Sequence, residues 1–131
     1  IFGVEIQKMM PAGREIIVGM NRDIQFGPLI MFGLGGVYVN ILRDVSFRLA
    51  PISAQAASEM ITETKSYALL RGVRGEPPAD INSIIDVILR ISQLSMDFRE
   101  ISEIDINPLF VYERNNGSLA LDVKITVTWG E

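Results

Sequence analysis

Oxygen-bearing side chains recur at every second position in one segment near the end of the chain, at Glu103, Asp105 and Asn107. In an extended strand alternate side chains share a face, so these three would project together. After a short reversal, Asp122 and Lys124 continue the same alternation. Carboxylate and amide oxygens are the hard donors that magnesium takes in proteins, often together with nucleotide phosphates. The two segments predict a magnesium site, provided that pairing brings Asn107 close to Asp122.

The register of this predicted hairpin decides whether the donors meet. A four-residue loop over residues 113–116 would pair Tyr112 with Gly117. That register places Asn107 directly opposite Asp122, where facing Cβ atoms lie roughly 5 Å apart. This register builds a metal site, and it is the one that we expect.

A second register is also compatible with the sequence. The dipeptide at residues 116–117, Asn-Gly, is a strong signal for a two-residue reversal. Such a turn would put Val111 opposite Asp122 and leave Asn107 about 13 Å along the strand. Independently of register, a hairpin with one wet face collects Asp, Glu and Asn without any metal. The acidic pattern alone therefore favours a solvated face over a metal site.

The composition sets limits on the fold and on the partners. The chain has 131 residues, of which 48% are hydrophobic and 21% are charged, as expected for a single globular domain over 1–131. Its net charge of -4, with no run of Lys or Arg, argues against nucleic acid or an anionic membrane as a partner. The apolar stretch at residues 29–39 is too short and glycine-rich to cross a bilayer.

Two residue types are missing, and each absence excludes some chemistry. Without cysteine there is no disulfide framework, so we predict a reducing, cytoplasmic setting. Without histidine there is no Ser-His catalysis, no histidine-ligated zinc and no phosphohistidine on this chain.

The chain also begins at Ile1, inside an alternating pattern, so we expect it to be a fragment.

The elements that would position these residues follow from periodicity and turn signals. Alternation predicts strands over residues 1–10, 14–22 and 28–32, and an extended piece over 44–49, with the glycine run 33–36 as a bend. Helical spacing predicts helices over about 54–64, capped by Ser53, and 81–96, capped by Asp80. With the acidic hairpin last, this order predicts an α+β fold, a mostly antiparallel sheet with helices packed on one face.

Several spaced motifs, in one order, resemble the ATP-grasp domain of ADP-forming acyl-CoA (acetate-CoA) synthetases. A more distant likeness is to the nucleotide-binding subunit of succinyl-CoA synthetase. The resemblance covers most of the chain and is carried by residues 13–19, 25–36, 44–49, 74–78, 103–109 and 121–122. It implies the C-terminal ATP-grasp subdomain, with the N-terminal subdomain absent from this chain.

The resemblance implies a ligand set for Mg²⁺ and for ATP or ADP. Asn107 and Asp122 would ligate magnesium, with Asp105 as a further or water-mediated ligand. In such enzymes an acyl-CoA, ADP and phosphate interconvert with a carboxylic acid, CoA and ATP, through an acyl phosphate and a phosphohistidine. The ATP-grasp half moves the phosphoryl group between histidine and ADP. The implied partner is a CoA-binding subunit or domain, and the isolated chain should be inactive.

The same resemblance assigns residues to the nucleoside. Gln7, Lys8 and Met9 would flank the adenine, and Glu15 would meet the ribose, since one carboxylate can accept hydrogen bonds from two hydroxyls. Gln7 departs from the Glu of the succinyl-CoA synthetase pattern. Alternatives to this function are a succinyl-CoA synthetase-like subunit, an ATP-grasp module fused to an acetyltransferase, and a non-catalytic assembly domain that holds a CoA-binding partner.

Overall fold

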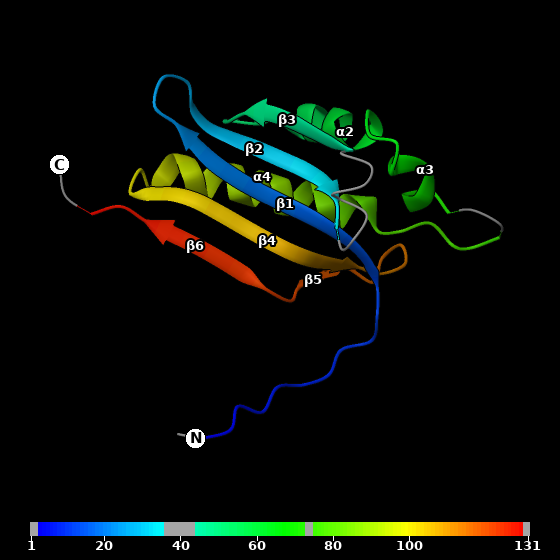
Figure 1. Cartoon of the computed structure of the whole chain (residues 1–131). Coiled ribbons are helices and arrows are strands. Elements are labelled where there is room, and N and C mark those ends of the chain that lie inside the picture. Colours follow the sequence, from blue (N-terminus) through cyan, green and yellow to red (C-terminus); the bar gives the residue numbers. More distant parts are fainter. Residues whose placement is uncertain (1–2, 36–43, 73–74, 130–131) are drawn as a thin grey trace.

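The computed structural model describes residues 3–35, 44–72 and 75–129, which form a six-stranded antiparallel sheet with helices on one face (Figure 1). The strand order is β3-β2-β1-β4, and β5 and β6 follow one another along the free edge of β4. This architecture confirms the predicted α+β fold. The elements are β1 (Arg14–Asp23), β2 (Gly27–Leu34), β3 (Val45–Leu49), α2 (Ala54–Thr62), α3 (Tyr67–Leu70), α4 (Ile81–Asp97), β4 (Ile101–Val111), β5 (Ser118–Ala120) and β6 (Val123–Val127).

Two helices form the layer behind the sheet, as Figure 1 shows for α2 and α4. The side chain of Asp80 caps α4 by accepting from the Ser83 N–H at 3.2 Å, and Ser53 caps α2 by accepting from the Ala56 N–H at 3.1 Å. Both caps were predicted and are confirmed. The short helix α3 was not predicted. Among the described residues, no helix is long and apolar enough to span a bilayer.

The core lies between the helices and one face of the sheet. Alternate residues of β1, such as Ile16 and Val18, point into it and are fully buried. Ile84 and Ile88 of α4 meet them from the other side, one helical turn apart. Phe32 of β2 is the largest fully buried side chain.

A bulge in β4 changes the alternation beside the candidate site. Ile16 pairs with Leu109, but Val18 pairs with Ile106, so β4 contains one more residue than β1 over this stretch. The extra residue allows both Ile106 and Leu109 to be buried in the core. Asn107, between them, is exposed.

The predicted first strand is wrong. Residues 3–13 form no helix or strand, and Val4, Ile6 and Met9 are between 86% and 92% exposed. Figure 1 shows this segment leaving the start of β1 and running away from the sheet. An alternating pattern becomes a strand only where a neighbouring strand supplies hydrogen bonds, and the described residues supply none here. Residues 1 and 2 lie outside the described part.

β2 extends further into the glycine run than predicted. β2 continues through Gly33 and Leu34 instead of ending at residue 32. The Gly35 N–H still donates to the Glu15 carbonyl oxygen at 3.0 Å, which keeps this stretch against β1. Residue 36, the last of the run, lies outside the described residues.

Candidate functional site

The hairpin that joins β4 to β5 has the four-residue loop. The Tyr112 N–H donates to the Gly117 carbonyl oxygen at 3.0 Å, so residues 113–116 form the loop. The Asn107 N–H donates to the Asp122 carbonyl oxygen, also at 3.0 Å. The same register continues into β6 as far as the pair of Glu103 with Thr126. The predicted register is confirmed, and the two-residue reversal is not used.

Charged side chains line β4 and β6 on the face turned away from the helices. Asp105 pairs across the strands with Lys124. The Lys124 Nζ also lies 3.9 Å from a carboxylate oxygen of Glu103, which accepts from the Thr126 hydroxyl at 3.4 Å. With Asp105 and Asp122 included, this stretch of the described residues carries three carboxylates and one ammonium group. The excess negative charge favours a cation.

The donors at this point of the sheet suit magnesium better than a softer metal. No group of three His, Cys, Asp or Glu side chains placed to hold a metal occurs among the described residues. The site instead offers the Asn107 amide with the carboxylates of Asp122 and Asp105, all oxygen donors. Mg²⁺ is commonly held in this way, by one or two carboxylates, with waters and substrate phosphates completing its shell.

Glu15 lies on β1, the strand beside β4, next to an apolar hollow. It is exposed, and its partner across the strands is Phe110. The hollow has a volume of about 680 Å³, and Leu34, Leu69 and Leu70 contribute its other large apolar walls. Along the strand direction Glu15 is two residues, about 7 Å, from the position that faces Asn107. One extended ligand on this face would reach both places.

The three residues expected to flank adenine are not brought against the other site residues. Gln7, Lys8 and Met9 are exposed in the segment that runs away from the sheet. The side chain of Gln7 donates to Glu5 within the same segment. The structure therefore gathers Asp105, Asn107 and Asp122 on one hairpin, with Glu15 on the adjacent strand and residues 7–9 apart from them.

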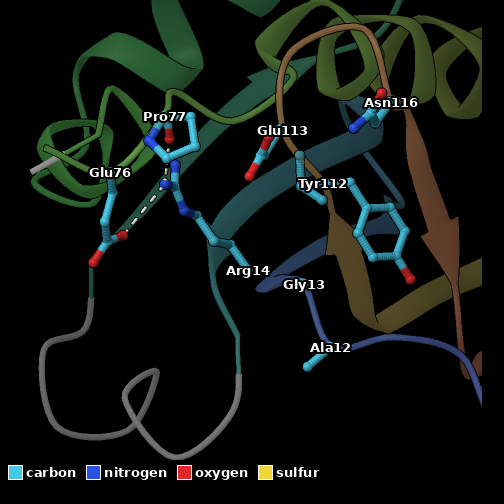
Figure 2. A pocket seen from close by; sticks show the side chains of 9 residues that line it. Ala12, Gly13, Arg14, Glu76, Pro77, Tyr112, Glu113 and Asn116 are labelled. Carbon is cyan, nitrogen blue, oxygen red and sulfur yellow. Dashed lines mark hydrogen bonds and ion pairs between the residues drawn. The ribbon is translucent and has the colours of Figure 1, made fainter.

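Sequence reasoning did not single out Arg14, which organises a second hollow at this end of the sheet. The hollow has a volume of about 500 Å³. Figure 2 shows Arg14 with Glu76 and Pro77 on one side of it, and Tyr112 on the other. Arg14 donates to the Pro77 carbonyl oxygen at 2.6 Å and lies 3.4 Å from a Glu76 carboxylate oxygen. These partners are distant in sequence, so no local motif indicated them. The apolar residues that line the first hollow were also not predicted, because two of them lie on α3, a helix that the sequence analysis did not find.

Comparison with known proteins gives consistent matches. Residues 1–127 match the ATP-grasp domain family, which confirms the resemblance read from the sequence motifs. The chain is 54% identical over 127 residues to acetate-CoA ligase [ADP-forming] I of Archaeoglobus fulgidus, covering 97% of this chain and 18% of that protein. It is 52% identical over 125 residues to the beta subunit of acetate-CoA ligase [ADP-forming] I of Pyrococcus furiosus, covering 95% and 53%.

A solved structure agrees in fold as well. The dinucleotide-forming acetyl-coenzyme A synthetase 1 of Ca. Korarchaeum cryptofilum matches with a TM-score of 0.85 and 47% identity, over 90% of this chain and 55% of that one. That structure contains coenzyme A and Mg-AMPPCP, and its phosphohistidine segment points towards the nucleotide-binding site. The present chain thus spans about half the length of the Pyrococcus subunit and less than a fifth of the Archaeoglobus protein.

Proposed function

The chain belongs to the ATP-grasp domain family, and we propose that it is the nucleotide-binding part of an ADP-forming acid-CoA ligase. The observation that supports this proposal is the backbone hydrogen bond from Asn107 to Asp122, which brings two residues with oxygen-bearing side chains opposite one another. Relatives that are about half identical are ADP-forming acetate-CoA ligases, and a related structure holds a magnesium nucleotide.

The proposed ligand is MgADP or MgATP lying on the open face of the sheet. Asn107 and Asp122 would ligate Mg²⁺, with Asp105 as a further or water-mediated ligand. Bound magnesium would neutralise charge on the phosphate oxygens. Glu15 would accept from the ribose hydroxyls, and the apolar hollow beside it offers a surface for the base. Gln7, Lys8 and Met9 would approach the base only if their segment folds back over this hollow.

The proposed reaction is phosphoryl transfer between a phosphohistidine and ADP. This chain contains no histidine, so the phosphorylated residue must lie on another segment or subunit. The chain's own contribution is positioning, because phosphoryl transfer depends on holding attacking and leaving oxygens in line. We assign it no residue that reacts covalently. The proposed partners are a CoA-binding subunit or domain and a second ATP-grasp subdomain that completes the nucleotide site.

A titration of MgADP followed by backbone amide NMR tests this proposal. We expect magnesium-dependent shifts centred on residues 105–107 and 122–124. Asp122→Asn should weaken the affinity by about tenfold or more, since loss of even an outer-shell partner of a metal commonly costs that much. Asp97→Asn, an exposed change of equal charge at the end of α4, should bind like the wild type. Equal affinities for all three proteins, or binding unaffected by EDTA, would favour a solvated face on a non-catalytic assembly domain.

A further inference from the structure

The loop of the β4–β5 hairpin is held by a segment that is distant in sequence. The Arg114 N–H donates to the Pro78 carbonyl oxygen at 3.0 Å, and Ala79 forms an isolated antiparallel bridge with Glu113. The Asp80 N–H donates to the Tyr112 carbonyl oxygen at 2.8 Å. Residues 78–80 thus run along one side of the loop like a short extra strand.

The side chain of Asp80 completes this attachment. One carboxylate oxygen accepts from the Ser83 N–H and caps α4, while the other accepts from the Gly117 N–H at 2.8 Å. The residue is only 8% exposed. A buried carboxylate is stable when such donors satisfy it. One carboxylate oxygen of Asp80 therefore caps the helix, and the other binds the hairpin.

The contact between Asp80 and Gly117 depends on which of the two registers the hairpin adopts. In the two-residue reversal favoured by Asn116 and Gly117, Tyr112 would face Leu121, and Gly117 would sit inside the turn. The Gly117 N–H would then lie away from Asp80, whose second oxygen would lose its donor. We propose that residues 78–80 act as a register clamp, and that Asp80 is a positioning residue that keeps Asn107 opposite Asp122.

The clamp is itself anchored to β1 through Arg14. The guanidinium donates to the Leu70 carbonyl oxygen at 3.0 Å and to the Pro77 carbonyl oxygen at 2.6 Å, directly before the clamp begins. Figure 2 shows this anchor across the hollow from Tyr112. The strand that carries Glu15 and the hairpin that carries Asp122 are thus tied together at one end of the sheet.

Loss of the clamp would lower the affinity for magnesium nucleotide only if the proposed function is correct. The register of the hairpin can be measured separately. Asp80→Ser keeps a good helix cap and removes the oxygen that reaches Gly117. Asp80→Ala removes both. Ser53→Ala removes the cap of α2, far from the hairpin, and serves as the matched control for loss of one cap. The readouts are amide hydrogen exchange, cross-strand NOEs between residues 107 and 122, and MgADP affinity.

For Asp80→Ser we expect amide exchange at Asn107 and Gly117 to be at least tenfold faster than in the wild type, with weaker cross-strand NOEs and weaker MgADP binding. Ser53→Ala should change none of these three. If Asp80→Ser keeps wild-type exchange and NOEs, Asp80 only caps the helix and the clamp is refuted. If the wild type fails to bind MgADP, the proposed function fails, while exchange and NOEs still decide the clamp. If the Asp80→Ala variant does not fold, the Asp80→Ser variant alone decides whether the clamp exists.

Discussion

At the scale of single residues, the position of Asn107 depends on its neighbours in β4 more than on its own chemistry. Alternation correctly places Glu103, Asp105 and Asn107 on the face opposite Ile104 and Ile106. Continued without interruption, the same alternation would turn the next odd-numbered residue of β4 to the wet face as well. The bulge prevents this and returns that residue to the core. Sequence periodicity alone does not locate a bulge, so this detail required the structure.

Two glycines in the loop before the clamp provide a test at this scale. Gly72 and Gly75 both have positive φ, 93° and 80°. An added Cβ at Gly75 meets open space, whereas at Gly72 it would overlap the Glu76 carbonyl oxygen. Gly75→Ala should lower the free energy of unfolding by about 1 kcal/mol, the cost of left-handed backbone for a non-glycine residue. Gly72→Ala should cost more, about 2 kcal/mol or above, in urea denaturation. Equal losses would contradict the steric difference.

At the scale of elements, an ion pair joins the edge strand β3 to the C-cap residue of α2. The two terminal Nη nitrogens of the Arg48 guanidinium donate to the two carboxylate oxygens of Glu63, at 2.9 and 2.6 Å. This hydrogen-bonded pair lowers the pKa of Glu63 and raises the pKa of Arg48. Because both side chains are partly exposed, solvent screens the pair and its contribution to stability is small.

The lowered pKa of Glu63 gives this pair a definite pH dependence. Its stabilisation is complete above the pKa of the unfolded chain and is lost as the pH falls through the lower pKa of the folded state. Glu63→Gln should therefore lower the melting temperature by up to a few degrees near pH 7, with the difference vanishing in strong acid. Thermal melts at a series of pH values measure this. Asp86→Asn, which breaks the exposed pair with Arg90, controls for net charge. A Glu63→Gln difference that is constant with pH would contradict the assignment.

Local signals predicted the elements well and long-range contacts poorly. Ser53 and Asp80 marked the starts of α2 and α4 because helix caps are decided by a few adjacent residues. The short helix α3 has no such signal, since Ser66 makes no capping hydrogen bond through its side chain. In the hairpin, the local Asn-Gly signal at residues 116–117 indicated the wrong turn. Partners far along the chain, such as Pro78, hold the loop instead.

At the scale of the whole molecule, the segment before β1 is separate from the fold. Val4, Ile6 and Met9 are exposed, and the Pro11 carbonyl oxygen accepts a hydrogen bond of 2.9 Å from the Tyr112 hydroxyl. Strand prediction failed here because a pattern in one segment contains no information about whether an edge is available to it.

Deletion of residues 1–9 tests both the separateness of this segment and its proposed role. The melting temperature should stay within about 1 °C of the wild type, because little apolar area is buried there. MgADP affinity should fall if Gln7, Lys8 and Met9 reach the base. Deletion of residues 1–6, which leaves those three in place, is the matched control and should bind normally. A loss of several degrees would show that the segment packs on the fold, and identical affinities for both deletions would remove these residues from the site.

The order in which the chain assembles follows from where the donors lie along it. Asn107 and Asp122 are joined by a single hairpin, so closing one short loop brings them together. Glu15 reaches the same surface only when β1 pairs with β4, a contact between opposite ends of the chain. Local contacts generally form faster than distant ones. During folding, the two proposed metal ligands should therefore come together before the proposed ribose ligand joins them, so a cation added early would bind before a nucleoside could dock.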